Sequence, residues 1–294
     1  MFAKAVALSG QYTRPVIISR RLENKEVASG IATYVVLNDT GWVVTAAHVV
    51  QGLLEMQKNA QERAKYHADV DVINANPLYS SGKKKHELGK LIRNPAWLTN
   101  HSLWWGIDGI GIKGNVTIDP AADLAVVQLS GPLHNLNIKS YPTFGNPDPT
   151  IFQPQGMSLC RLGYPFHEIT SVFDESMNAF SIPNLPHLNM FPNDGILTRH
   201  IMHEDVTTKR MIRFVETSSA GLLGQSGGPI FDTNGTIWAI QVKTTHLSLG
   251  FSPKVKFNGK EIVEHQFMHC GWGAHVSHLK AICDQVGIAY NAVP

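Results

Sequence analysis

The chain has 294 residues, of which 43% are apolar and 16% charged, so it can bury a sizeable core and does not have the composition of a disordered protein. Lysine and arginine outnumber aspartate and glutamate by only two (25 against 23), and the one basic run, residues 83–85, is typical of a solvated loop, so we expect no nucleic-acid partner. No uncharged apolar run approaches the roughly 18 residues of a membrane-spanning helix, so we expect no membrane association.

The cysteines indicate a reducing compartment. Cys160, Cys270 and Cys283 are too few for the disulfide framework of a small secreted protein, and an odd number leaves one unpaired. The first ten residues carry one lysine and a short apolar stretch, below the roughly 7 to 15 apolar residues of a signal peptide. We therefore expect a cytoplasmic protein.

The first half of the chain reads mainly as strands. Apolar, β-branched residues predict strands at 15–19 and 31–37, and the polar turn at 38–41 leads into a further strand at 42–44. After this strand the residue composition changes. Residues 49–64 predict one or two helical turns, and residues 70–73 predict a strand again.

The second half continues the strand pattern around one long interruption. Residues 166–205 hold three prolines and many polar residues, so we expect a long irregular surface loop there. Asn234 and Gly235 mark the turn of a hairpin. The expected elements of this half are strands at 125–129, 157–162 and 211–217, a glycine-rich turn at 221–228, the hairpin at 229–243 and a helix at 276–286.

Three short segments carry the residue types of nucleophilic catalysis. A serine hydroxyl is a weak nucleophile, so it needs a histidine to take its proton, a carboxylate to orient that histidine, and donors for the oxyanion. His48 ends the segment TAAH at 45–48, Asp123 lies in ADLAVV at 122–127, and Ser226 lies in GQSGGP at 224–229. Each segment alone is weak, but their order along the chain points to a Ser–His–Asp triad.

These segments resemble the three signature segments of the trypsin/chymotrypsin-like serine proteases. Residues 29–32 (SGIA) and 273–277 (GAHVS) are similar to bacterial HtrA-type peptidases, although no recognisable PDZ-type module follows. The resemblance implies a serine endopeptidase in which Ser226 attacks the scissile carbonyl, His48 is the general base and then acid, and Asp123 orients His48. The amides of Gly224 and Ser226 would form the oxyanion hole.

The resemblance also implies the fold. We expect a mainly β protein over residues 1–294, a single domain of two antiparallel six-stranded barrels with a C-terminal helix. The first barrel would span about 14–135 with an insertion at about 51–117, and the second about 150–290 with the long loop at about 166–205.

A protein or peptide substrate would bind as an added strand. By the resemblance, its side chain before the scissile bond would enter a pocket with two walls. The position six before Ser226, which carries an aspartate in trypsin, is Ala220, so the pocket floor has no carboxylate there and a small or medium apolar residue is expected. The walls are Ala220 and Gly221 on one side, and Val242, Lys243 and Thr244 on the other.

Regulation is expected to differ from animal trypsins. Gln225 stands where those enzymes carry the aspartate that pairs with a new N-terminus. We therefore expect control by an activating or inhibiting protein partner or by the 166–205 loop, and a dedicated protein target. Neither cofactor nor metal is expected, because the spacing of the histidines and cysteine within 265–278 matches no zinc motif.

Two other functions remain open from sequence. Residues 224–228 also fit the Gly-x-Ser-x-Gly elbow of α/β-hydrolases, which would indicate an esterase. A helix should follow that elbow, whereas the sequence predicts a strand and a turn. The other alternative is a binding protein that keeps the protease fold without catalysis.

Overall fold

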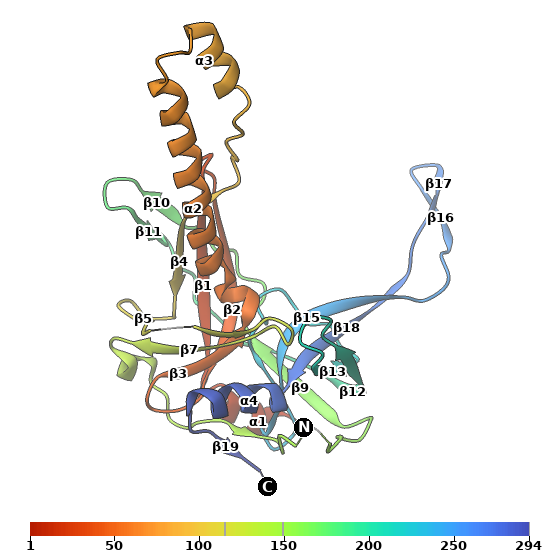
Figure 1. Ribbon diagram of the computed structural model, residues 1–294. Helices are drawn as coiled ribbons and strands as arrows, with labels where there is room; N and C mark the ends of the chain where they lie inside the picture. Colours follow the sequence, from red (N-terminus) through yellow and green to blue (C-terminus); the bar gives the residue numbers. More distant parts are fainter. Residues whose placement is uncertain (115, 149, 294) are drawn as a thin grey trace.

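Two β-sheets form the body of the molecule, and two slender arms project from it (Figure 1). The computed structural model describes residues 1–114, 116–148 and 150–293. The predicted fold class, a mainly β protein of chymotrypsin type with a C-terminal helix, is confirmed. None of the described helices is both long and apolar enough to span a membrane.

The first sheet has seven strands, and His48 and Asp123 lie just beyond the paired ends of two of them. Its strands are β1 (Thr13–Leu22), β2 (Val27–Val36), β3 (Trp42–Ala46), β4 (Leu98–Trp104), β5 (Gly111–Ile112), β6 (Thr117–Asp119) and β7 (Leu124–Ser130). The pairing order is β4-β1-β2-β3-β7-β5, with β6 also on β7, and this path does not close within the described residues. Most residues of β3 and β7 are buried, because these two strands lie in the interior of the sheet and contribute to the main core.

The second sheet closes on itself. Its strands are β8 (Thr143–Phe144), β9 (Ser158–Gly163), β12 (Phe191–Glu204), β13 (Met211–Thr217), β14 (Pro229–Phe231), β15 (Ile237–Ser248), β18 (Phe267–His275) and β19 (Asn291–Ala292). The order β14-β9-β12-β13-β18-β15 returns to β14, which also pairs with β15. This ring has the six strands expected for the second barrel, and β8 and β19 extend it through parallel pairs.

Short helices cover the ends of the sheets. They are α1 (Ala3–Ser9), the 3₁₀ turn η1 (Leu133–Leu136) and α4 (Val276–Val286). In α4 the buried positions Val276, Leu279 and Cys283 recur at intervals of three and four, which places one face of the helix on the core. The helix ends at Gly287, whose φ of +79° is the left-handed conformation that glycine adopts readily.

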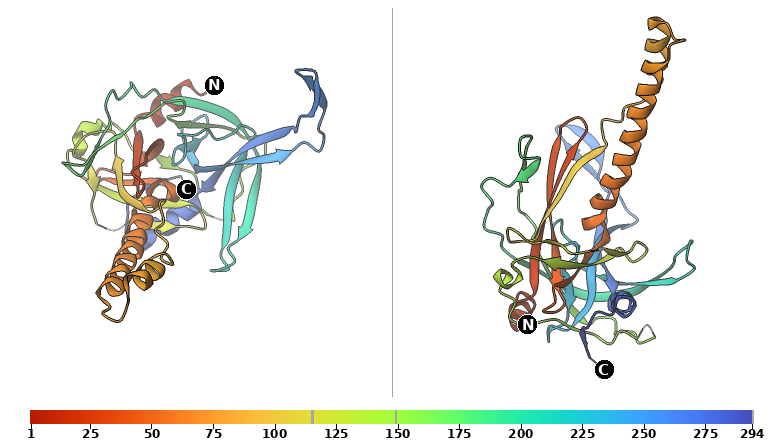
Figure 2. Two further views of the ribbon diagram at one scale, coloured as in Figure 1. Left: turned by 90° about the horizontal axis from the view of Figure 1, so that it is seen from above. Right: turned by 60° about the vertical axis from the view of Figure 1, so that its left-hand side comes forward.

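The helical arm is the largest departure from expectation. α2 (Ala47–Ala75) carries His48 in its first turn and is followed by α3 (Ser81–Leu88), and together they rise well clear of the sheets (Figures 1 and 2). The expected strand at 70–73 is wrong, because α2 runs through it. Only five residues of α2 are buried, the last of them Asn59, so the outer turns depend on helix-forming side chains rather than on a core.

The insertion expected at 51–117 is narrower than expected. β4, β5 and β6 fall within or across its second half, and all three pair with the first sheet. The expectation is therefore wrong for the residues of β4 and β5 and for the start of β6.

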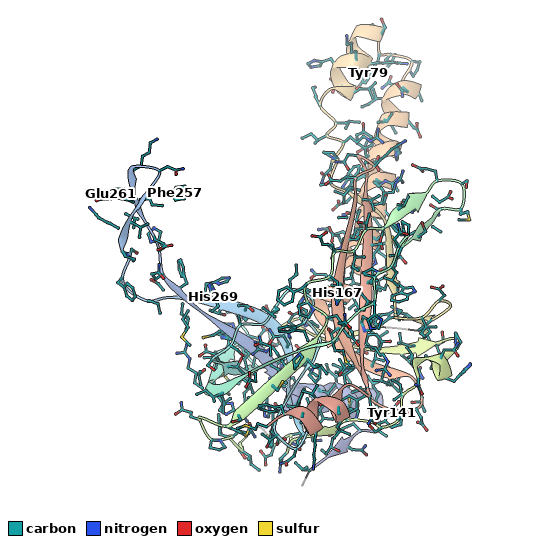
Figure 3. All side chains as sticks on the ribbon, turned by 180° about the vertical axis from the view of Figure 1, so that it is seen from behind. Tyr79, Tyr141, His167, Phe257, Glu261 and His269 are labelled. Carbon is teal, nitrogen blue, oxygen red and sulfur yellow. The ribbon has the colours of Figure 1, made fainter. Side chains whose placement is uncertain are left out.

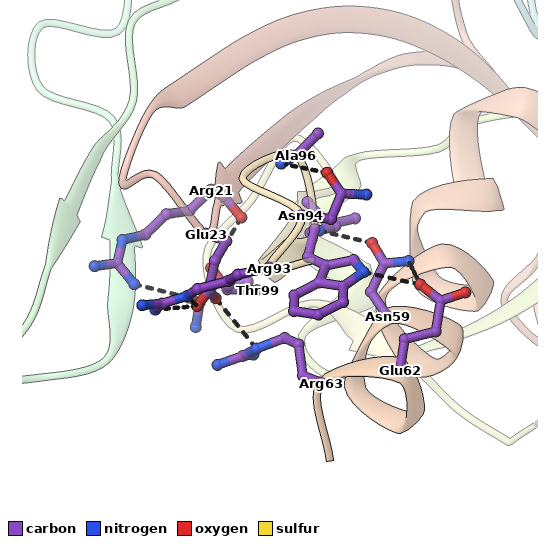
Figure 4. Close-up of polar contacts among 12 residues, drawn as sticks. Arg21, Glu23, Asn59, Glu62, Arg63, Arg93, Asn94, Ala96 and Thr99 are labelled. Carbon is purple, nitrogen blue, oxygen red and sulfur yellow. Dashed lines mark hydrogen bonds and ion pairs between the residues drawn. The ribbon is translucent and has the colours of Figure 1, made fainter. Parts of the chain in front are cut away.

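A buried carboxylate anchors the base of the helical arm (Figure 4). The side chain of Glu23, 7% exposed, forms ion pairs with Arg63 of α2 and with Arg93. Beside this cluster the backbone N–H of Leu98 donates to Asn59 Oδ1 over 2.7 Å. The turn after β1, helix α2 and the chain entering β4 are thus tied together.

The loop expected at 166–205 is partly regular. It holds the hairpin of β10 (Val172–Asp174) and β11 (Ala179–Ser181), and then β12, which forms a wall of the closed barrel. The expectation of an irregular loop is wrong for 191–204. Most of β12 is exposed, and its sequence lacks the apolar alternation that predicts a half-buried strand. Pro192 lies near its start, where a strand tolerates proline.

The second arm is a β-ribbon. β15 and β18 continue beyond the barrel and lead to the hairpin of β16 (Lys254–Phe257) and β17 (Lys260–Val263) (Figures 1 and 2). Figure 3 shows Phe257 and Glu261 near the tip of this arm and Tyr79 near the tip of the helical arm. The two arms leave separate sheets.

We expect Glu23→Gln to loosen the helical arm from the body. The substitution removes the negative charge from a buried site shared by Arg63 and Arg93, and we expect a loss of about 1–2 kcal/mol because both arginines can still reach water. Faster amide hydrogen exchange in α2 would report it. The exposed Glu87→Gln, which breaks only a pair with Lys90, is the matched control, and equal exchange in both variants would contradict the anchoring role.

We expect stability to fall in acid partly through His101. Its ring packs on Gly52 of α2, and burial lowers its pKa to about 4. An unfolded histidine has a pKa near 6.5, so between about pH 6.5 and pH 4 the unfolded chain binds the proton first and the folded state loses stability as pH falls. Urea unfolding of the wild type and His101→Phe across this range should give a shallower pH dependence for the variant. Equal dependence would contradict this role.

Candidate active site

The register of two neighbouring strands brings His48 and Asp123 together. β3 ends at Ala46 opposite Leu124, the first residue of β7, so the residues just beyond that pair meet at the sheet edge. Asp123 has a φ of +54°, in the left-handed region that non-glycine residues seldom occupy and that aspartate tolerates better than most.

Asp123 holds the start of α2 with three acceptors. Its backbone oxygen accepts from Ala47 N–H at 2.9 Å, Oδ1 accepts from His48 N–H at 3.0 Å, and Oδ2 lies 2.8 Å from His48 Nδ1. A carboxylate only accepts, so this contact places the ring proton on Nδ1 and leaves Nε2 able to take a proton. The two predicted residues therefore form the oriented histidine that the chemistry requires.

Ser226 shares a cavity with His48. The cavity has a volume of about 820 Å³ and is lined by His48, Gly224 and Ser226 together with residues of β1, β2 and the loop at 166–169, which contributes both apolar and polar side chains. His167 of that loop lies beside the long strands of the first sheet in Figure 3. Phe166 (75% exposed) and Leu223 (91% exposed) also line the cavity, and they could not be identified from sequence because neither follows a core periodicity.

The turn before Ser226 leaves two amides available. Gly224 has a φ of +98°, and an added Cβ would lie 2.4 Å from the carbonyl oxygen of Tyr164. The turn is closed by a bond from Gln225 N–H to the oxygen of Leu222. Among the described residues, no backbone bond uses the N–H of Gly224 or Ser226 as a donor. Both amides predicted for the oxyanion hole are thus free to bind an oxygen.

Gln225 locks this turn from inside. It is fully buried; its Oε1 accepts from Leu222 N–H at 3.0 Å and its Nε2 donates to the oxygen of Phe191 at 3.2 Å. A neutral amide therefore joins the turn to β12. The serine is followed by β14 and not by a helix, so the α/β-hydrolase alternative is wrong for this chain.

The two sheets meet at the nucleophile turn. Thr33 of β2 donates its N–H to the oxygen of Ser226 at 2.8 Å and its hydroxyl to the oxygen of Gly224 at 2.7 Å. An added Cβ at Gly227 would fall 2.1 Å from the oxygen of Thr33 and 2.2 Å from Oγ1 of Thr45. The absence of a side chain at Gly227 is what allows this approach.

The walls of the predicted substrate pocket touch each other. Thr244 Oγ1 donates to the oxygen of Gly221 at 2.6 Å, and Asn193 Nδ2 donates to the oxygen of Ala220 at 2.7 Å. Val242 is buried, and the ammonium of Lys243 lies over the ring of Trp272 at 4.3 Å. The structure places the five predicted residues in two facing segments with a hydrogen bond between them.

The described residues contain no group of three or more side chains suited to hold a metal ion. In the C-terminal histidine and cysteine set, Cys270 and His275 are buried whereas His265 and His269 are exposed. Burial lowers the pKa of His275 to about 2, so it is neutral in the folded chain.

Comparison with known proteins shows which family the chain is similar to. A family model described as a trypsin-like peptidase domain matches residues 32–240, a range that contains His48, Asp123 and Ser226. No curated protein matches the chain in sequence. The HtrA-type protease AlgW with a decapeptide is similar in structure at 12% identity and a TM-score of 0.51, covering 98% of this chain and 68% of that one. The Rv3671c protease from M. tuberculosis in its active form is 14% identical with a TM-score of 0.48, covering 98% and 86%.

We expect Gly224→Ala to destabilise the nucleophile turn. The substitution adds left-handed strain and a contact of 2.4 Å with backbone, so the loss should be about 2 kcal/mol or more. Gly156→Ala is the matched control, because Gly156 has a φ of +83° with nothing within 4 Å and should lose only about 1 kcal/mol. Urea unfolding measures both, and equal losses would show that the turn has room for a side chain.

Proposed function

Because the chain belongs to the trypsin-like peptidase family, we propose that it is a serine endopeptidase that uses His48, Asp123 and Ser226 as its triad. The observation that carries the proposal is the contact of Asp123 with both the backbone N–H and Nδ1 of His48, beside a cavity that His48 and Ser226 both line. These contacts support His48 as the general base of acyl transfer, with Ser226 in the same cavity as the nucleophile.

In the proposed reaction Ser226 Oγ attacks the scissile carbonyl while His48 Nε2 takes the hydroxyl proton. Asp123 stabilises the imidazolium that forms, and the N–H groups of Gly224 and Ser226 bind the oxyanion. His48 then returns the proton to the leaving amine, which breaks the peptide bond and leaves an acyl-enzyme. Water activated by His48 hydrolyses this ester and regenerates Ser226.

We propose a protein or peptide substrate that binds as an added strand, and a dedicated target in the cytoplasm. The cytoplasmic compartment is supported by the cysteines, since Cys160, Cys270 and Cys283 are all unpaired and buried. Control by a protein partner or by the loop at 166–205 is supported by the contact between Gly221 and Thr244, which closes the pocket, and by the place of residues 166–169 in the cavity wall.

A catalytically silent binding protein is the second candidate. The contact between Thr244 and Gly221 favours it, because a substrate side chain cannot lie between walls that share a hydrogen bond of 2.6 Å. The two functions differ in the reactivity of Ser226.

We expect a fluorophosphonate probe to label the wild-type protein at Ser226. Ser226→Ala should abolish labelling, and His48→Ala and Asp123→Ala should slow it by about 10³-fold or more because the hydroxyl loses its base. Intact-mass spectrometry measures the label. Ser130→Ala, a serine of β7 outside the cavity, should label as the wild type does.

Two results would separate the candidates. Labelling that persists in Ser226→Ala would place the reactive group elsewhere and contradict the triad. A wild type that stays unlabelled, alone and with candidate partners, would favour the binding protein.

A further inference from the structure

Arg161 is a buried cation in the middle of β9. Only 1% of the residue is exposed, and its terminal nitrogens contact the oxygen of Ser219, at 2.8 Å, and the hydroxyl of Thr217. Its Nε has no hydrogen-bond partner among the described residues. No carboxylate within the described ranges forms an ion pair with it, whereas Arg199 of the same barrel pairs with Glu216.

The guanidinium lies directly behind the predicted substrate pocket. Gly271 of β18 pairs with Thr217 on one side and with Thr244 on the other, and its N–H donates to the oxygen of Ser219. A Cβ on Gly271 would fall 2.5 Å from both terminal nitrogens of Arg161. The guanidinium therefore fills the space over Gly271, next to the wall residue Thr244.

Other polar groups turn toward the same place. Asn193 stands opposite Arg161 in the pairing of β12 with β9, and its amide donates to Ala220. Ser219 Oγ is buried without a hydrogen-bond partner among the described residues, and so is Oε1 of Gln241, whose Nε2 would lie 2.1 Å from a Cβ on Gly221. Of these groups the Ser219 hydroxyl can donate to an incoming acceptor, whereas Gln241 Oε1 is itself an acceptor and the Asn193 amide is already bonded to Ala220.

A buried guanidinium without a carboxylate costs free energy, because neutral oxygens replace its hydration only in part. Burial lowers the pKa of Arg161 to about 10, so it still carries its proton at neutral pH. A charge retained at such a cost, over Gly271 and next to the predicted wall residue Thr244, marks a candidate site for an anion.

We infer that Arg161 is the specificity-determining residue of the pocket, and that the pocket takes an acidic side chain, so that the substrates are polypeptides cleaved after glutamate or aspartate. The inference rests on the proposed function. An acidic substrate side chain is thus inferred in place of the small or medium apolar one expected from Ala220. That expectation considered only the segment before Ser226, whereas the cation comes from β9. Entry of the carboxylate requires the Thr244–Gly221 bond to open.

Binding of product peptides to the Ser226→Ala protein tests this without catalysis. Two N-acetylated peptides that differ only in a C-terminal glutamate or glutamine are compared by isothermal titration calorimetry. We expect the glutamate peptide to bind about 10-fold to 100-fold more tightly, since a hydrogen bond to a charged group is lost in the other. Adding Arg161→Gln should remove this difference, and Arg161→Lys should keep part of it. Arg199→Gln, which removes a paired arginine of the same barrel, should leave it intact.

Equal affinities of the two peptides, or no binding of either, would overturn the inference, as would a preference that survives Arg161→Gln. If Arg161→Gln does not fold, the pH dependence of the affinity difference between the two peptides, measured with Ser226→Ala, decides. The preference must then vanish below about pH 4, where the glutamate side chain becomes neutral. Labelling of Ser226 in the wild type reports the proposed function separately.

Discussion

The carboxylate of Asp123 is the contact on which the site depends. Strands β3 and β7 end side by side, and Asp123 uses its backbone oxygen and both side-chain oxygens to hold Ala47 and His48. Two backbone N–H groups at the start of α2 would otherwise lack acceptors, since a helix leaves its first donors unpaired. One residue in a left-handed conformation therefore caps the long helix and orients the imidazole at once. The same residue, Asp123, therefore fixes both the start of the helical arm and the orientation of the candidate catalytic base.

The second constraint is the seam between the sheets. Thr33 of the first sheet binds the oxygens of Gly224 and Ser226, so the nucleophile turn is fixed by a strand that belongs to the other half of the molecule. Gly227 makes this possible, because a side chain there would overlap Thr33 and Thr45. Gln225 completes the support from the side of β12. The free amides of the turn thus owe their direction to contacts from both sheets.

Sequence was sufficient for the parts of the molecule that local chemistry determines. The segments around His48, Asp123 and Ser226 were identified because each combines a buried strand with a residue type that the reaction needs. The length of α2 could not be read, because its outer turns have no buried stripe and so no apolar period. β12 was missed for a related reason: most of its side chains are exposed, so pairing rather than burial makes it a strand. Arg161 was missed because its role comes from strand register, which sets it behind Gly271.

The free energy needed to open the pocket can be compared with the free energy that a carboxylate would gain at Arg161. The bond between Thr244 and Gly221 joins two neutral groups, and such a bond adds about 0.5–1.5 kcal/mol net. A carboxylate reaching Arg161 would form charge-assisted bonds of about 1.5–3 kcal/mol each and would relieve an uncompensated charge. A neutral side chain would separate the walls without forming charge-assisted hydrogen bonds to Arg161. A closed pocket over a lone guanidinium therefore makes opening itself selective, since only an anion recovers more free energy than the separation of the walls costs.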